Sequence, residues 1–362
     1  MKKRRHPVVR LLRLLFWIAL LPLAYVVGVI GYTWMTDYKP APETSVEVHG
    51  TPGKTSWAPG DSTIRLFNWN IGYGGLGAKS DFWKDDDGSG MVHSPREFVD
   101  EYVAGIHSVI EQFRDSTDFF LLQEVDRSSD RSYGRDEAES IAERLPGFAW
   151  CYGKNYDVDY IPVPLLEPYG GVESGLVTYS TTQPGEATRF SFEGNYPFPT
   201  GLFYLDRCYL LTRFPVENGK ELVVINTHNS AYDDGSLKKR QMAQMAEVLK
   251  AEYAKGNFVI VGGDWNQFPA GFGGLPGFPI AAGLGMAVPA EYPEAGWHWA
   301  WSDNAPTNRS LYDPFDQDTT MRKVIDFYLL SPNMALDTVY NIDLNFQYSD
   351  HQPVWLKARI RP

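Results

Sequence analysis

The chain has 362 residues, of which 43% are hydrophobic and 22% charged, and this balance excludes a disordered or collagen-like protein. Its formal net charge is −12, but six of its 33 basic residues precede Asp37 and no acidic residue does. The remaining 27 basic and 45 acidic side chains give the rest of the chain a charge of −18, which disfavours binding to polyanions unless a bound cation reverses the local field.

The first predicted element is a membrane-spanning helix. Residues 14–36 contain no charged side chain and are long enough to cross a hydrocarbon core of about 30 Å. A cleaved signal peptide is the alternative, but its apolar stretch would be about 7–15 residues long and would end in a small-residue cleavage site. The basic head, residues 1–13, places the N-terminus in the cytoplasm by the positive-inside rule, so we expect a single-pass anchor with the rest of the chain outside the cytoplasm.

Residues 37–62 are rich in Pro and Gly and are expected to form a stalk. From residue 63 to residue 361, apolar strand-like runs alternate with helical stretches, which predicts one catalytic domain of α/β or α+β type. Two helices are expected at 95–113 and 237–253, with Ser94 and Ser236 as their N-caps. The strands are expected at 64–70, 119–125, 175–180, 221–228, 258–264 and 324–330.

The chain has two cysteines, Cys151 and Cys208, each beside aromatic or apolar residues in a strand-like run. Buried free thiols are the favoured interpretation. An exported chain would also permit one disulfide bond, and the sequence does not show whether the two sulfurs meet. There is no zinc-binding pattern.

Polar side chains capable of acid–base chemistry stand where the predicted apolar strands end, and a folded sheet can gather such ends into one pocket. They are Asn70, Glu124, Asn226, His228, Asp264, Asn266, Asp326, Asp350 and His351. Taken singly, Asn70 or Asp264 is equally well explained as a turn residue, and a lone histidine as an ordinary core or surface side chain. Glu124 is harder to explain in that way, because a carboxylate buried in an apolar run is costly without a cation or a donor.

As a set, these residues fit the hydrolysis of a phosphoester. Glu124, Asn70 and Asp350 offer the hard oxygen ligands that suit Mg²⁺ or Mn²⁺, with coordination positions left for water and phosphate oxygens. The two histidines could supply a base and an acid for in-line attack by water, and the other polar groups could stabilise charge on the phosphoryl oxygens.

Eight motifs in order resemble the endonuclease/exonuclease/phosphatase superfamily, and they span nearly all of residues 63–361. They are FNWNIG, LLQEVD, VESGLVTYS, LDRCYLL, VINTHNSAYD, VGGDWN, VIDFYLLS and SDHQPV. The resemblance implies a four-layer sandwich, in which two mixed β-sheets pack face to face with helices outside, and a metal pocket at one end. Within the superfamily, the chain resembles the type-I-like deoxyribonuclease and neutral sphingomyelinase branches, because its NTHNS motif carries the second histidine of those branches.

The resemblance also implies roles for the matched residues. Glu124 would be the main metal ligand, Asn70 would lie beside it, and Asp350 would face the metal region. Asp264 and Asn266 would hold the nucleophile and the transition-state oxygens.

The two histidines would each pair with a carboxylate, which fixes the tautomer of an imidazole and raises its basicity. His351 with Asp326 is assigned as the base, and His228 with Glu173 as the acid. Arg207 of LDRCYLL matches a phosphate-contacting arginine, although a solvated charge at a strand start is the alternative.

The substrate is expected to be a phosphoester, with a lipid head group favoured over nucleic acid. Gly72 and His228 depart from the abasic-site endonucleases, and Asp126 stands where secreted deoxyribonucleases place a basic residue. A membrane anchor would hold the active site close to phospholipids. Asn226 and Trp297 are expected to contact the substrate.

Two alternatives remain open. The first is an exported endonuclease acting on DNA or RNA, and the second is an inactive binding domain on a membrane stalk. No obligate protein partner is inferred.

Overall fold

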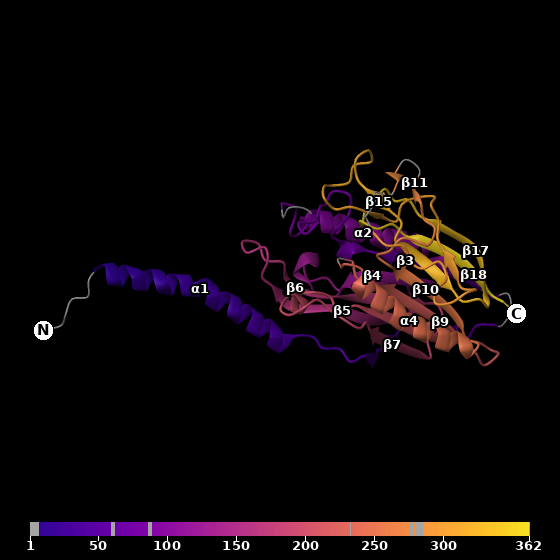
Figure 1. The fold of residues 1–362 in the computed structure, drawn as a ribbon. Coiled ribbons are helices and arrows are strands. Elements are labelled where there is room, and N and C mark those ends of the chain that lie inside the picture. Colours follow the sequence, from indigo (N-terminus) through magenta and orange to yellow (C-terminus); the bar gives the residue numbers. More distant parts are fainter. Residues whose placement is uncertain are drawn as a thin grey trace.

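The computed structural model describes residues 7–58, 62–85, 89–231, 233–275, 278–279 and 285–361. Most of the described strands belong to two seven-stranded sheets (Figure 1). The first sheet has the order β1 (Glu43–Ser45), β7 (Glu186–Ser191), β8 (Cys208–Pro215), β9 (Glu221–His228), β10 (Phe258–Asp264), β16 (Asp326–Leu330), β13 (His298–Ala300). The second has the order β17 (Met334–Asn341), β18 (Val354–Ile360), β3 (Thr63–Asn70), β4 (Phe119–Asp126), β6 (Gly170–Ser180), β5 (Ala149–Ile161), β2 (Val48–His49).

Helices and two short ribbons complete the described elements. The ribbons are β11 (Gly274–Leu275) with β12 (Phe278–Pro279), and β14 (Asn308–Arg309) with β15 (Arg322–Lys323). The α-helices are α1 (Pro7–Thr36), α2 (Arg96–Phe113), α3 (Glu137–Ala142) and α4 (Ser236–Ala254). The 3-10 turns are η1 (Gly72–Gly74), η2 (Arg114–Ser116), η3 (Asp130–Ser132) and η4 (Thr200–Phe203).

Side-chain alternation along the strands builds the layers, because successive residues of a strand face opposite sides of its sheet. In β3, Leu66 packs into the core between the two sheets, whereas Phe67 packs outward against α2 and α3. In β10, Ile260 points into the same inner core and Val261 packs outward beneath α4. The four-layer sandwich of two mixed sheets with outer helices is therefore confirmed.

The inner faces of the strands change from apolar to polar along their length. In β3 the inner positions run Ile64, Leu66, Asn68, Asn70, and in β9 they run Leu222, Val224, Asn226, His228. Parallel pairing of β3 with β4, and of β9 with β10, brings the ends of these strands to one edge of the sandwich. The polar ends therefore meet between the two sheets, which positions the site described below.

The close approach of the two sheets requires a glycine at one inner position. A Cβ atom on Gly262 would lie 2.6 Å from Cε1 of Tyr328 and 2.8 Å from Cδ1 of Leu121, on the opposite sheet. The GGD motif at the end of β10 thus serves packing as well as turn formation.

The segment expected to be a stalk is instead part of the folded body. β1 pairs with β7 at the edge of the first sheet, and β2 pairs with β5 at the edge of the second. Trp57 is buried in the inner core and stacks on Phe119. Apolar side chains within this Pro- and Gly-rich segment explain the difference, because they bury surface that a stalk would leave in water.

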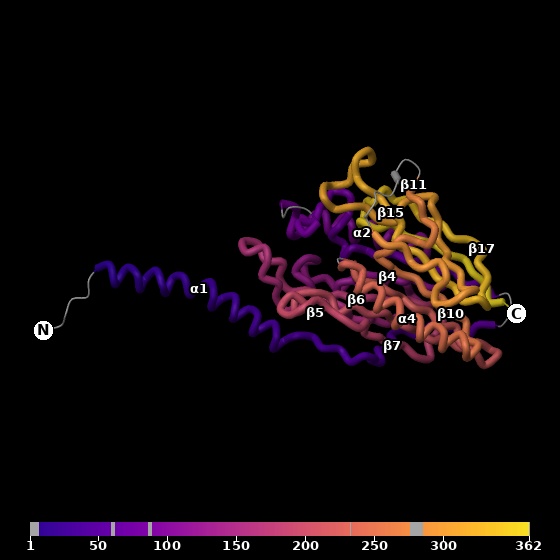
Figure 2. The backbone as a smooth tube through the Cα atoms, viewed as in Figure 1, coloured from indigo at the N-terminus to yellow at the C-terminus, as the bar shows by residue number. Residues whose placement is uncertain are grey.

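The N-terminal element is one long helix, α1, which includes the apolar run and is long and apolar enough to cross a membrane. It leaves the body on the side of β5 and β6, as the smooth backbone trace of Figure 2 also shows. Its C-terminal half lies along the end of β5, where the Tyr32 hydroxyl donates to Asp159 at 2.9 Å and the hydroxyls of Tyr25 and Tyr160 are 3.4 Å apart.

The predicted helix caps are wrong in both cases. The Ser94 hydroxyl donates to the carbonyl of Gly75 rather than capping α2. At α4 the carboxylate of Asp233 accepts the backbone N–H of Leu237 at 2.8 Å, so an aspartate before the expected serine satisfies the first turn.

Cys151 and Cys208 are free thiols, and both are buried in one small apolar cluster with Leu176 and Leu210. Burial raises the pKa of the Cys151 thiol to about 12 and that of Cys208 to about 11. Both thiols are therefore protonated and unreactive in the folded protein.

Candidate active site

The strand ends gather one hydrogen-bonded group of side chains. Nδ2 of Asn70, at the end of β3, donates to Oε1 of Glu124 at 3.1 Å and to Oδ2 of Asp264 at 3.2 Å. Asn70 thereby joins a carboxylate of the second sheet to a carboxylate of the first. The predicted convergence of Asn70, Glu124 and Asp264 is present in the structure.

Glu124 reaches the site through a β-bulge. The register of β4 against β6 shifts between Leu122 and Val125, and Glu124 has a φ of +51°. Regular alternation would place Glu124 on the outer face, next to Leu122, so the bulge is what turns its carboxylate towards the site. A left-handed conformation at a non-glycine residue is consistent with a functional position.

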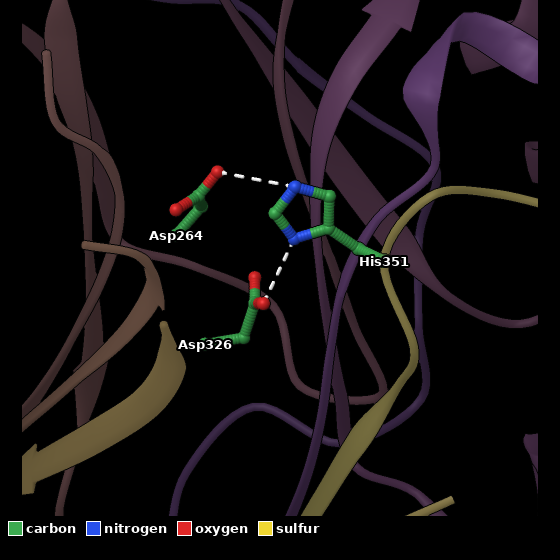
Figure 3. Close-up of side chains that lie close together, drawn as sticks. All are labelled: Asp264, Asp326 and His351. Atoms are coloured by element: carbon green, nitrogen blue, oxygen red, sulfur yellow. Dashed lines mark hydrogen bonds and ion pairs between the residues drawn. The ribbon is translucent and has the colours of Figure 1, made fainter. Parts of the chain in front are cut away.

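His351 is held between carboxylates of different strands (Figure 3). Its Nδ1 lies 2.8 Å from Oδ2 of Asp326, and its Nε2 lies 3.6 Å from Oδ2 of Asp264. Burial alone would lower the pKa of His351, but the charges of Asp326, Asp264 and Asp350 outweigh burial and raise it to about 10. The predicted pairing of His351 with Asp326 is present.

His228 has a different environment. Its Nε2 lies 3.4 Å from Oδ2 of Asp264 and 3.9 Å from Oε1 of Glu124. Its Nδ1 is buried and has no hydrogen-bond partner among the described residues. Burial, together with the positive charges of Arg207 and His351, holds the pKa of His228 well below its usual value. The imidazole is therefore neutral in this site.

Glu173 is not the partner of His228. Its carboxylate is partly exposed and pairs with Nζ of Lys154 at 3.2 Å, on the neighbouring strand β5. The inner positions of β6 at this point include Ser174, which lines the cavity, so alternation turns the adjacent Glu173 to the other face.

Asp264 and Asn266 shape the turn after β10. Oδ1 of Asp264 accepts the backbone N–H of Asn266 at 2.9 Å, while its Oδ2 faces both histidines. Asn266 has a φ of +50°, and its Nδ2 donates to the carbonyl of Asn229 at 3.0 Å. Both side chains line the cavity, so they lie where a phosphoester would be bound.

Asn226 does not reach this cavity. It is buried between the sheets, where its Nδ2 donates to the carbonyls of Leu122 and Val177, both at 3.0 Å, and its Oδ1 accepts from Nε2 of Gln123 at 2.7 Å. Gln123 Nε2 also donates to Asn68. These amides form a polar layer between the apolar core and the site, so the substrate-binding role expected for Asn226 is wrong.

Trp297 is also remote from the site. It is buried beneath α4, edge-on to Tyr253, in the outer core of the first sheet. Its indole is used for packing rather than for the expected substrate contact. Arg207, by contrast, does line the cavity, as the matched motif implied.

Asp350 lies next to His351, with its Oδ2 3.8 Å from Nε2 of that histidine. Burial raises the pKa of Asp350 to about 7, His351 opposes that effect, and the negative charge of Glu124 adds to it. Asp350 and Glu124, with Asn70 hydrogen-bonded to Glu124, form an oxygen-rich group that fits a divalent cation.

A second group also offers metal ligands. Asp264, Asp326 and His351 each present one ligand atom, and these atoms lie within 4.8 Å of one another. The Asp326–His351 hydrogen bond already occupies Nδ1 of the histidine, so this group is better explained as a proton-transfer chain. The oxygen-rich set of Glu124, Asn70 and Asp350 is the stronger candidate for Mg²⁺ or Mn²⁺.

The site opens into a cavity of about 1160 Å³. Glu124, His228, Asp264, Asp350 and His351 line its polar part. A larger part of its wall is apolar and aromatic. These lining residues include Tyr73, Phe82, Trp83, Tyr156, Ile161, Val163, Tyr169, Phe203, Leu205, Leu311 and Met321.

Two residues of the site, Asn308 and Asn155, were not predicted from the sequence. Nδ2 of Asn308, on β14, lies 2.9 Å from Nε2 of His351. Asn155 of β5 lines the cavity, and its Nδ2 has no hydrogen-bond partner among the described residues. Neither residue ends an apolar run, so the pattern that revealed the other side chains gives no signal for them.

The sandwich fold and a site of carboxylates, amides and two histidines at its strand ends define a phosphoester hydrolase. A family model described as the Endonuclease/Exonuclease/phosphatase family matches residues 67–351. The chain therefore belongs to this family, and it is an enzyme that hydrolyses phosphoester bonds.

Solved structures show the same fold at low sequence identity. ANGEL2, a 2',3'-cyclic phosphatase, matches with a TM-score of 0.54 and 15% identity over 88% of this chain and 99% of its own. The endonuclease/exonuclease/phosphatase from Beutenbergia cavernae DSM 12333 matches with a TM-score of 0.52 and 18% identity over 83% of this chain and 72% of its own. The protein of the same description from Bacteroides vulgatus has a TM-score of 0.51 and 14% identity, covering 83% of this chain and 100% of its own. No curated protein matches the sequence significantly.

Proposed function

We propose that this phosphoesterase is a single-pass membrane protein that acts outside the cytoplasm. Its substrate would be the phosphodiester of a lipid head group or another small phosphoester. We further propose that it uses Mg²⁺ or Mn²⁺. The uncharged run of residues 14–36 supports the anchor, and the basic residues before it support an N-terminus in the cytoplasm.

One observation carries the choice of substrate. The cavity joins a charged end, where the histidines and carboxylates lie, to a long apolar wall that includes Ile161, Val163 and Phe203. Basic side chains such as Arg207 also line the cavity and would suit any phosphate, but only a molecule that also has an apolar portion would use the apolar wall. The end of β5 that forms part of the wall is also where α1 contacts the body.

Glu124, Asn70 and Asp350 would hold the cation. When bound, it would neutralise their charge and polarise a phosphate oxygen, which favours attack at phosphorus. The rest of the chemistry belongs to the protein's own side chains.

We assign the two histidines by the charges around them. Asp264 and His228 are placed to orient the attacking water and to accept its proton, because His228 is neutral. His351 is placed to give its proton to the leaving oxygen, because Asp326, Asp264 and Asp350 favour its protonated form. This assignment reverses the roles expected from the sequence, where Glu173 was taken as the partner of His228.

The test compares two substrates under one condition. The purified full chain with Mg²⁺ is incubated in parallel with phospholipid vesicles and with plasmid DNA, beside a His351→Ala variant. We expect head-group release without nicking, lost in the variant. Nicking without head-group release would establish the endonuclease instead, and activity on neither substrate would direct the search to soluble phosphoesters.

A further inference from the structure

Three apolar side chains protrude from the body close to α1. Outside α1, the described part of the chain has three large hydrophobic side chains that are more than two-thirds exposed: Leu165 (70%), Leu166 (99%) and Phe198 (69%). Leu165 and Leu166 form the tip of the hairpin between β5 and β6, and Phe198 precedes η4. Leu165 and Leu166 are adjacent and present one contiguous apolar surface, which is typical of an interaction site.

The contacts of α1 show in which direction the hairpin points. Tyr32 and Tyr25 of α1 contact Asp159 and Tyr160 in succession, so the hairpin runs back along the helix, away from its C-terminal end. From Thr36 to Tyr25 the helix rises by about 16 Å. The hairpin tip, which follows Tyr160, therefore lies alongside the apolar part of α1.

The backbone of the tip is suited to a medium with little water. Pro162, Pro164 and Pro168 have no N–H to leave unpaired, and the N–H of Tyr169 donates to the carbonyl of Val163 at 3.1 Å. Fewer free donors lower the cost of moving this loop into a bilayer. The single charge at the tip, Glu167, favours a zwitterionic surface over an anionic one.

The same hairpin borders the cavity. Ile161, Pro162 and Val163 line its wall, and on another part of its rim Tyr312 and Met321 are exposed apolar side chains. A bilayer that contacts the tip would lie beside this apolar rim.

We propose that the tip of the β5–β6 hairpin, with Phe198, is a membrane-binding surface that inserts into the zwitterionic leaflet containing the C-terminal end of α1. It turns the apolar rim of the cavity towards that leaflet, so that a lipid passes from the bilayer along the apolar wall to the histidines. This inference rests on the proposed membrane anchor and lipid substrate.

A first experiment measures contact with the bilayer independently of activity. The full chain is placed in phosphatidylcholine nanodiscs with a single environment-sensitive fluorophore on Leu166→Cys. The matched control carries it on Leu336→Cys, because Leu336 is an exposed apolar side chain (42%) on β17 in the second sheet, with β18 between it and the rest of the body. The native Cys151 and Cys208 are buried and will not take the label.

We expect blue-shifted emission at position 166, with strong quenching by spin-labelled lipids, and neither effect at position 336. Equal spectra and equal quenching at the two positions would overturn the proposal, whether or not the enzyme hydrolyses lipid.

A second experiment measures the effect on turnover. The double variant Leu165→Asp/Leu166→Asp should lose about tenfold or more in hydrolysis of vesicle phospholipid, because both side chains lose their apolar burial. Its hydrolysis of soluble bis(p-nitrophenyl) phosphate should stay unchanged, as should both activities of Leu336→Asp. Equal losses on both substrates would contradict a membrane-binding role. If the unmodified enzyme hydrolyses only the soluble ester, the proposed lipid substrate is wrong. The fluorescence experiment would still show whether the hairpin tip contacts the membrane.

Discussion

Single side chains decide the chemistry of the cavity, and the two histidines differ most clearly. His351 is surrounded by three carboxylates that favour its protonated form, whereas burial and positive neighbours keep His228 neutral. The surroundings of the two imidazoles therefore favour opposite protonation states. A general acid and a general base require this difference.

The leaving group distinguishes these two roles. A phosphodiester with an alkyl leaving group needs a proton on the departing oxygen, whereas p-nitrophenolate leaves without one. His351→Ala should therefore lose about 10²–10⁴-fold in kcat/KM on the alkyl ester and much less on the p-nitrophenyl ester. His228→Ala should lose a similar factor on both. An equal loss for His351→Ala on the two esters would show that His351 does not protonate the leaving oxygen.

Asn226 provides a prediction about stability rather than catalysis. Asn226→Ala would remove three buried hydrogen bonds: the two that Nδ2 donates to the carbonyls of Leu122 and Val177, and the one that Oδ1 accepts from Gln123. The free energy of unfolding, measured by urea denaturation of the full chain in detergent, should fall by about 2–3 kcal/mol. Gln112→Ala, on the exposed face of α2, is the control. A normal stability with a raised KM would restore the substrate-binding role.

The sequence predicted most of the site, for a physical reason. Glu124, Asp264 and Asp326 lie at or near an end of an apolar strand, and His351 lies shortly before β18. A sheet that buries both faces must bring those ends together. Glu173 was misjudged because facing depends on register, which is set by bulges and by pairing across strands. Asn226 faces the inner side as expected, but it lies deeper between the sheets than His228 and is used in the buried amide layer. Trp297 shows that aromatic content alone does not separate a packed core from a binding surface.

At the scale of elements, the six expected strands are all present, and most of those missed lie at or near the edges of the sheets. The short strands β1 and β2 come from a Pro- and Gly-rich segment in which strand propensity is weak, so the neighbouring strands determine their conformation. The N-cap of α4 was misassigned because Asp233 and Ser236 offer equivalent side-chain oxygens close together, and only tertiary packing selects between them.

The integration of β1 and β2 leads to a test at this scale. Trp57→Ala should lower the free energy of unfolding by about 3–5 kcal/mol, because a large side chain is removed from the inner core. Thr51→Ala, at an exposed position in the same segment, should have little effect. Thermal unfolding of both variants measures the difference, and a Trp57 variant as stable as the parent would mean that this segment behaves as a stalk after all.

At the scale of the whole molecule, the charge is divided by α1. Four basic residues precede this helix and two more, Arg10 and Arg13, lie in its first two turns, whereas the chain beyond it carries a charge of −18. An acidic body close to a membrane repels anionic lipids over a distance of about 10 Å at 0.1 M salt. A zwitterionic surface carries no net charge, so the acidic body would meet no such repulsion there.

Ionic strength tests this consequence. Hydrolysis of an anionic phospholipid in vesicles should rise as salt is added from low concentration, because screening weakens the repulsion, while hydrolysis of phosphatidylcholine should change little. Initial rates measured over a salt series in both kinds of vesicle provide the comparison. A fall in the anionic rate with added salt would show that local basic groups at the cavity dominate the field instead.

The central claim is that the strand ends form a phosphodiesterase site that depends on a divalent cation held by Glu124, Asn70 and Asp350. The most direct test is turnover of bis(p-nitrophenyl) phosphate by the full chain as free Mg²⁺ is varied, in the parent enzyme and in Glu124→Gln. We predict no turnover after chelation, recovery with Mg²⁺ or Mn²⁺, and a Mg²⁺ requirement raised at least about tenfold in the variant. Full turnover in the presence of a chelator, or a variant with an unchanged Mg²⁺ requirement, would contradict the claim.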